Sequence, residues 1–152
     1  MNSPGVLSRH GQRLLQIGVA LLLFTSFEGF VVRYFAVPRL GLSVHTLSAL
    51  QAVLIAVLGL VWPQLNLGPA GSRAAFWLLV YSTLAITAAY LLGAIWGAGN
   101  TTMPLAAGAA RGTAFQETLI KVVAYSSAPT GIVSFALVLW GLRREPTGTI
   151  SR

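Results

Sequence analysis

Four long runs of apolar residues, separated by short polar stretches, dominate the sequence. A helix that crosses the hydrocarbon core of a bilayer needs about 20 mainly apolar residues, and each run is long enough. The pattern therefore predicts an all-α integral membrane four-helix bundle, with Ser43 as the N-cap of the second helix. The predicted helices cover about residues 14–32, 44–65, 74–96 and 115–142 of a single domain spanning 1–152.

Composition agrees with a membrane protein and excludes several other classes. Hydrophobic residues make up 55% of the chain and charged residues 9%, whereas a soluble globular chain carries about 25% charged residues. A water-facing shell cannot be built from so few charges, and abundant apolar side chains argue against disorder. The absence of cysteine excludes disulfides, thiolate zinc sites, iron–sulfur clusters and covalently attached c-type haem.

The net charge of +7 arises from cations, most of which flank the apolar runs. Cations in that position set topology and contact anionic lipid headgroups, so we expect the lipid bilayer and no nucleic acid as a partner. Because the more positive side is normally cytoplasmic, both termini are predicted to face the cytoplasm. One side would carry Arg9, Arg13, Arg73, Arg143, Arg144 and Arg152, and the other Arg33, Arg39 and Arg111.

Polar residues inside the predicted helices gather near the non-cytoplasmic boundary. With a rise of about 1.5 Å per residue, the main ones lie within roughly 15 Å of that boundary. Because an unpaired ionisable group is costly within a membrane, this concentration predicts a polar cavity at one level of the bundle. The residues are Glu28, His45, Ser48, Gln51, Tyr90, Gln116, Glu117, Lys121 and Tyr125.

The charged members of this group have two interpretations. Glu117 and Lys121 stand one helical turn apart, so they either neutralise each other or belong to a functional site. Glu28 has no partner within its own helix and requires Lys121, an arginine or a proton. Both interpretations leave Glu28, Glu117 and Lys121 as candidates for a proton network or a buried ion pair.

His45 is the only histidine within the predicted helices. Small residues line its helix face, a pattern typical either of close helix–helix packing or of a flat wall for a planar macrocycle. The histidine is accordingly either hydrogen-bonded within the fold or an axial ligand. A haem held by His45 alone would keep one open coordination position, which favours ligand binding or catalysis over electron transfer. The small residues are Ser48, Ala49, Ala52, Ala56 and Gly59.

Several segments resemble bacterial hydroxylaminobenzene mutase, a family of small four-span membrane proteins. The resemblance extends from Leu14 to Arg143 and includes loop positions that hydropathy alone does not determine. It implies an isomerase of the bacterial inner membrane that rearranges an arylhydroxylamine to a 2-aminophenol, an enzymatic Bamberger rearrangement. The segments are PRLGLSVH (38–45), LGLVWP (58–63), WGAGNTTMPLAAG (96–108), FQETLI (115–120) and LVLWGLR (137–143).

The chain is more distantly similar to styrene oxide isomerase, which converts aryl epoxides to aldehydes. That enzyme is a trimer with ferric haem b between its subunits, and its axial histidine opens the second helix. The resemblance therefore implies non-covalent haem b with His45 as its one protein ligand. The substrate-site tyrosine of that family matches Tyr90. Its asparagine, six residues after the histidine, falls on Gln51, and the longer amide puts the size or pose of the substrate in doubt.

These resemblances lead to one mechanistic hypothesis and two alternatives. Ferric haem would act as a Lewis acid toward the N–O oxygen of a small aromatic substrate, while Tyr90 and Gln51 either orient the heteroatom or shuttle its proton. Arg33 and Arg39 would pair either with the haem propionates or with lipid headgroups. The alternatives are an aryl epoxide isomerase and a non-catalytic membrane haem-binding protein. The resemblance also implies a homo-oligomer, specifically a trimer.

Overall fold

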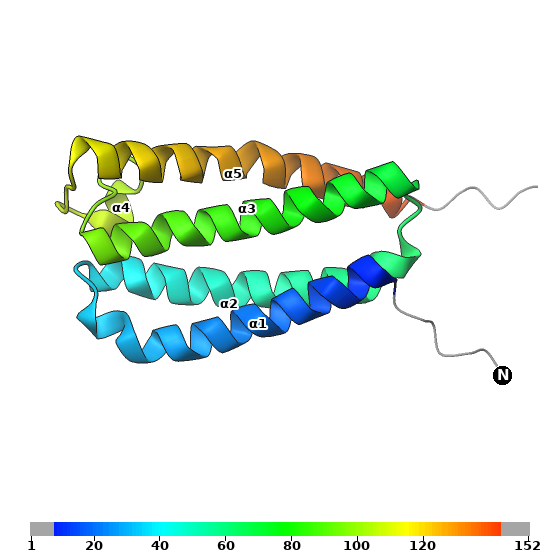
Figure 1. The fold of residues 1–152 in the computed structure, drawn as a ribbon, viewed down its shortest axis with the longest axis horizontal. Coiled ribbons are helices and arrows are strands. Elements are labelled where there is room, and N and C mark those ends of the chain that lie inside the picture. The colour runs from blue at the N-terminus through cyan, green and yellow to red at the C-terminus, as the bar shows by residue number, and fades with distance from the viewer. Residues whose placement is uncertain (1–7, 144–152) are drawn as a thin grey trace, which may run out of the picture.

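Two helical hairpins make up residues 8–143, the part of the chain that the computed structural model describes (Figure 1). In the first hairpin α1 packs along α2, in the second α3 packs along α5, and the hairpins meet through α2 and α3. All four helices are long and apolar enough to cross a membrane, so the chain is a multi-pass membrane protein. The long helices are α1 (Arg9–Val31), α2 (Pro38–Val61), α3 (Pro69–Trp96) and α5 (Ala114–Gly141).

The predicted all-α fold is confirmed, but the helices begin earlier than hydropathy indicates. α2 begins at Pro38, whose fixed φ suits the first helical position. Ser43 is therefore not an N-cap, and its hydroxyl donates to the carbonyl of Arg39 within the helix (3.0 Å). α1 is capped by Ser8, whose hydroxyl accepts from the amide of Gly11 (3.1 Å). Hydropathy locates the apolar part of each helix, whereas the helix itself continues to its cap.

Short elements close the connections between the long helices. The 3-10 turns Val32–Tyr34 and Trp62–Gln64 follow α1 and α2, and the one-turn helix α4 (Pro104–Ala107) lies in the α3–α5 connection. α4 contacts α2, so it covers the end of the interface between the two hairpins. We call the end of the bundle that carries α4 and the α1–α2 connection the loop end (Figure 1).

The described chain ends lie together at the opposite end, which we call the terminus end (Figure 1). There the amide of Asn66, in the α2–α3 connection, donates to the carbonyl of Gly141 at the end of α5 (2.7 Å). This arrangement agrees with the prediction that both termini share one side of the membrane. Two of the arginines used for that prediction, Arg144 and Arg152, lie outside the described residues.

Small residues bring α1 and α2 into close contact. A Cβ atom added to Gly59 would lie 2.7 Å from the carbonyl oxygen of Gly11, and one added to Gly18 would lie 2.8 Å from that of Ala52. Ala52 and Gly59 are both buried, so the close-packing interpretation of the small-residue stripe is confirmed for them. The flat-wall interpretation is wrong for these two residues because their faces already contact α1.

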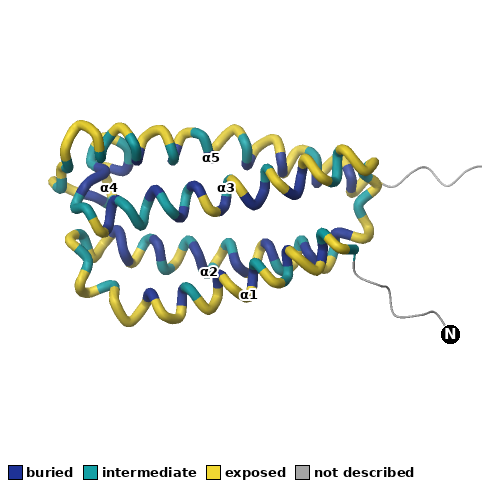
Figure 2. The backbone as a smooth tube through the Cα atoms, in the orientation of Figure 1, coloured by how far each residue is buried: buried dark blue, intermediate teal, exposed yellow. Residues whose placement is uncertain are grey.

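Hydroxyl groups, together with one glycine, join α3 to α5. Ser134 donates to the carbonyl of Ala75 (2.9 Å), and Ser82 donates to the carbonyl of Ser127 (2.8 Å). A Cβ atom on Gly131 would lie 2.7 Å from the hydroxyl oxygen of Ser82. Such contacts suit helices in lipid, where packing and interhelical hydrogen bonds replace the hydrophobic effect. Figure 2 shows the buried positions facing the neighbouring helices and the exposed positions facing outward.

We expect Gly59→Ala to destabilise the protein by about 1–3 kcal/mol, because its methyl group would overlap the α1 backbone. Thermal unfolding in detergent would measure the change. Gly71→Ala is the matched control, since a Cβ atom there would meet only Leu67, at an ordinary 3.7 Å. Equal stability of the two variants would contradict the tight α1–α2 contact.

Candidate functional site

Glu28 and His45 form the one ion pair found among residues 8–143. Nδ1 of His45, on α2, lies 3.1 Å from Oε2 of Glu28, on α1. The Glu28 side chain is only 2% exposed, whereas the His45 side chain is 38% exposed. Glu28 was expected to need Lys121, an arginine or a proton, so its partner differs from the predicted ones. The reason is that the α1–α2 packing brings the imidazole to it.

The imidazole lies on the outer surface of the α1–α2 hairpin. Nδ1 faces Glu28, and the neighbouring Cε1 faces Gly29, where an added Cβ atom would be only 3.0 Å away. Among the described residues, Nε2 has no hydrogen-bond partner. Both sequence interpretations of His45 therefore remain open, because the ring is hydrogen-bonded within the fold and still has a nitrogen available for a ligand.

Gln51 faces a different helix from His45. It stands six residues later on α2, which rotates its side chain by about 120° around the helix axis. Its amide oxygen accepts a hydrogen bond from the hydroxyl of Thr87 on α3 (2.8 Å). Sequence reasoning did not identify Thr87. The sequence feature that could have identified Thr87 is its position, as a polar residue one turn before Tyr90 on the same helix.

Tyr90 lines an open pocket of about 240 Å³ at the loop end, between α3 and α4 together with the two residues that precede α4. The pocket walls are mainly apolar and include Met103 and Leu105. Two of its hydroxyl groups have no hydrogen-bond partner among the described residues, that of Tyr90 and the buried one of Thr102. The pocket therefore offers polar groups to a small ligand with an apolar body.

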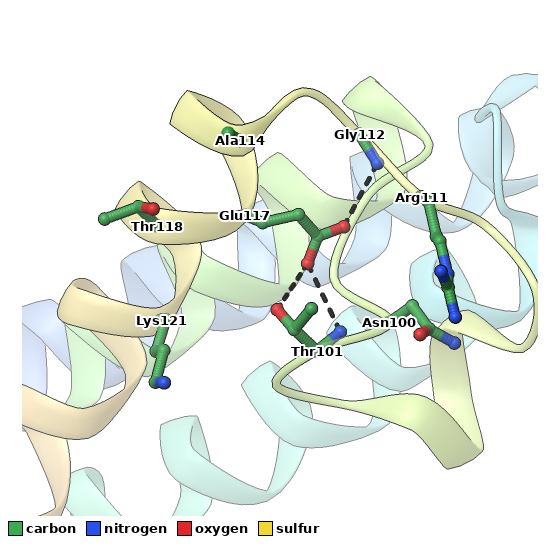
Figure 3. Close-up of a pocket in the computed structure, with 8 residues that line it drawn as sticks. All are labelled: Asn100, Thr101, Arg111, Gly112, Ala114, Glu117, Thr118 and Lys121. Atoms are coloured by element: carbon green, nitrogen blue, oxygen red, sulfur yellow. Dashed lines mark hydrogen bonds between the residues drawn. The ribbon is translucent and has the colours of Figure 1, made fainter.

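Glu117 organises the connection between α3 and α5 (Figure 3). Its Oε1 accepts from the amides of Gly99 (2.8 Å) and Gly112 (3.1 Å). Its Oε2 accepts from the hydroxyl (2.6 Å) and the amide (3.3 Å) of Thr101. One carboxylate thus ties both ends of the connection to the start of α5.

The interpretation that Glu117 and Lys121 neutralise each other is wrong, because Glu117 binds the loop backbone. The ammonium group of Lys121 lies 5.8 Å from the ring centroid of Tyr125. Lys121 also lines an open pocket of about 480 Å³ with Arg111 (Figure 3). The polar residues do lie toward one end, but they form separate groups, so the single cavity predicted from their depth is not present in one chain.

The two arginines proposed to pair with propionates or lipid headgroups lie at the loop end and are exposed. The guanidinium group of Arg33 hydrogen-bonds the hydroxyl of Tyr34 and lies 4.6 Å from that ring. The backbone carbonyl of Arg39 accepts the Ser43 hydroxyl. Neither arginine has an acidic partner in the part of the chain that the structure describes. Both can still bind an anion.

The side-chain donor atoms of residues 8–143 determine which kind of metal group the protein could hold. Residues 8–143 contain no group of three histidine, aspartate or glutamate side chains that could hold a bare metal ion. A porphyrin brings four nitrogens of its own, so it needs only one further nitrogen from the protein. Nε2 of His45 is such an atom, and Glu28 at Nδ1 is the carboxylate partner that metal-bound histidines usually have. The residues present therefore fit haem.

We expect Glu117→Gln to loosen the α3–α5 connection, because hydrogen bonds to a charged group are worth about 1.5–3 kcal/mol and neutral ones about half that. Hydrogen exchange should speed up by about tenfold at the amides of Gly99, Thr101 and Gly112, since 1.4 kcal/mol is a factor of ten. Lys121→Gln is the control and should leave these rates unchanged. An equal increase in the exchange rates of both variants would contradict this result and would indicate that Glu117 and Lys121 do form an ion pair.

Comparison with known proteins identifies the family of this chain. A family model described as styrene oxide isomerase matches residues 10–143. Hydroxylaminobenzene mutase HabB of Ectopseudomonas oleovorans is 44% identical over 146 residues, covering 96% of this chain and 89% of that protein. Hydroxylaminobenzene mutase HabA of the same organism is 34% identical over 131 residues, covering 86% and 97%. No solved structure matches. The chain belongs to the styrene oxide isomerase family and is an isomerase homologous to the hydroxylaminobenzene mutases.

Proposed function

We propose that this protein rearranges an arylhydroxylamine to a 2-aminophenol, with haem b held by His45. The observation that carries the proposal is an imidazole paired with a buried carboxylate through Nδ1 and without a partner at Nε2 among residues 8–143. The names of the two relatives support the substrate class, because both are hydroxylaminobenzene mutases. Ferric haem, when bound, supplies a Lewis acid for the N–O oxygen of such a substrate.

Tyr90 and Gln51 orient the substrate in this proposal. The phenol of Tyr90 has no hydrogen-bond partner among the described residues, so it is available to a substrate heteroatom. The amide oxygen of Gln51 is used by Thr87, which leaves the amide N–H groups of Gln51 as donors. Groups that keep the migrating oxygen beside the ring favour the ortho carbon through proximity.

The walls of the pocket beside Tyr90 are mainly apolar. Met103 and Leu105 face the same pocket as Tyr90. A ring that carries positive charge during the rearrangement would be captured by bulk water and give other products. Enclosure of this open pocket by a second copy, with these apolar side chains as walls, would exclude water and favour intramolecular transfer of the hydroxyl group.

The separation of these groups supports a homo-oligomer as part of the proposal. His45 contacts α1, whereas Tyr90 lies in a pocket with α4 and the residues before it, and none of the described interactions of His45 reaches Tyr90 or Gln51. A second copy packed on the α1–α2 hairpin would enclose the exposed imidazole and supply the missing pocket. We propose a trimer, as the resemblance implies, with Arg33 and Arg39 near the propionates.

The membrane placement completes the proposal. The described arginines Arg9, Arg13, Arg73 and Arg143 belong to the terminus end, and Arg33, Arg39 and Arg111 to the loop end. By the positive-inside rule, this charge difference supports a cytoplasmic terminus end in a bacterial inner membrane. The histidine and the Tyr90 pocket then lie toward the outer leaflet, which small apolar aromatic compounds reach directly.

The second candidate function is isomerisation of an aryl epoxide to an aldehyde. It is favoured by the family model, whose description is styrene oxide isomerase and which matches residues 10–143. Both reactions leave the redox state unchanged and begin by breaking a bond to oxygen. Substrate identity, rather than the nature of the site, separates them.

We expect membranes containing the protein to convert phenylhydroxylamine to 2-aminophenol and to show a Soret band. His45→Ala should abolish both, and Tyr90→Phe should keep the band while lowering kcat by about 10²-fold, the lower end for loss of a proton-transfer group. His10→Gln is the control, because His10 lies at the terminus end against Ser72 and Phe76. Product chromatography and absorption spectra make the measurement.

Each of the other outcomes contradicts a specific part of the proposal. Turnover of styrene oxide without 2-aminophenol would identify an epoxide isomerase. A Soret band without turnover of either compound would indicate a non-catalytic haem-binding protein. Full activity of His45→Ala would remove His45 from its role.

A further inference from the structure

Glu28 is an acidic side chain in an unusual position. It lies inside the apolar span of α1, is 2% exposed, and has His45 as its hydrogen-bonding partner among the described residues. Its second oxygen, Oε1, is buried without a partner. Burying a carboxylate in an apolar environment is costly, so an ordinary core position would not hold one. The contact with His45 is the one interaction that accounts for its presence there.

Gly29, the next residue, lets the imidazole approach the α1 backbone. A Cβ atom at this position would lie 3.0 Å from Cε1 and 3.2 Å from Nδ1 of His45. A glycine inside a helix costs about 1 kcal/mol relative to alanine, so its use here implies a compensating benefit. The benefit is that α1 offers a surface without a side chain, against which one edge of the imidazole ring packs.

These two contacts together determine how the ring is turned. The Nδ1–Cε1 edge faces α1, with Nδ1 at Glu28 and Cε1 at Gly29, while Nε2 is left without a partner. A carboxylate accepts hydrogen bonds, so a proton on Nδ1 is donated to Oε2 and Nε2 keeps its lone pair. The lone pair on Nε2 is what a metal ligand requires.

We propose that Glu28 and Gly29 are positioning residues that hold His45 with Nδ1–H donated to Glu28 and Nε2 presented as the ligand nitrogen. The inference rests on the proposed function in one respect, which is that the iron of haem is the partner of Nε2. Neither residue touches the substrate. Glu28 also makes the imidazole a stronger electron donor, because an anionic acceptor at Nδ1 raises ligand basicity. A stronger donor favours ferric over ferrous iron.

The first experiment examines the ring without haem. The full-length His10→Gln protein, labelled with ¹⁵N-histidine and placed in lipid nanodiscs, reports His45 alone. We expect Nδ1 to be protonated and Nε2 to be unprotonated, and Glu28→Ala to shift the population to the Nε2–H tautomer. An unaltered tautomer in Glu28→Ala, or an Nε2–H tautomer in the parent protein, would overturn the proposal.

The second experiment uses the haem-loaded protein. Glu28→Gln keeps the length of the side chain but removes its charge. The ratio of ferrous to ferric protein at a given potential should therefore rise about tenfold, which corresponds to a rise of about 59 mV in the one-electron reduction potential. Gly29→Ala should weaken haem binding by about tenfold, because the added methyl group would push the imidazole away from α1 and disturb its hydrogen bond to Glu28, and loss of such an orienting interaction typically costs 10–100-fold. Gly71→Ala is the matched control and should change neither quantity.

The outcomes separate this inference from the proposed function. Absence of a Soret band in the wild type would reject haem, while the nitrogen spectra would still decide the orientation of the ring. Haem binding with unchanged potential in Glu28→Gln and unchanged affinity in Gly29→Ala would overturn the positioning role and leave His45 as ligand. If Glu28→Ala fails to fold, Glu28→Leu, which is of similar size but has no hydrogen-bond acceptor, takes its place in the nitrogen measurement.

Discussion

The close approach of α1 to α2 is the constraint on which the rest of the structure depends. Gly11 and Gly59 touch at the terminus end, and at the loop end the same packing brings Glu28 within hydrogen-bonding distance of His45. Lipid offers no hydrophobic drive between helices, so packing of small residues has to provide the contact. The glycines that allow α1 and α2 to approach therefore also reduce the cost of burying the Glu28 carboxylate, because the same approach places His45 within hydrogen-bonding distance of it.

The distribution of polar groups explains why one chain does not form a complete site. His45 faces outward from the first hairpin, whereas Tyr90 lies beside the α3–α5 connection that Glu117 ties to α5. Each hairpin thus carries one of the two groups to which the proposed function assigns a role. In the proposed function, association of copies would bring the His45 nitrogen and the Tyr90 pocket together, and the helices expose apolar faces on which a second copy could pack.

Sequence patterns predicted the four helices and the depth of the polar residues, but not the partners of those residues. Helix spacing relates residues of one helix, so it suggested Glu117 with Lys121 and left Glu28 without a partner. The observed partners are a residue of another helix for Glu28 and backbone amides for Glu117, and neither has a local signal. Gly29 did have a local signal in the sequence, since a glycine beside a buried acid in a helix indicates that another group approaches the helix backbone closely.

The most direct test of the central claim is an experimental structure of the full-length protein in lipid nanodiscs, at a resolution that places imidazole rings. The account predicts Glu28 within hydrogen-bonding distance of Nδ1 of His45, with Nε2 directed at a bound planar group that a neighbouring copy helps to enclose. A structure with Glu28 apart from His45, or with Nε2 turned toward the carboxylate, would contradict it.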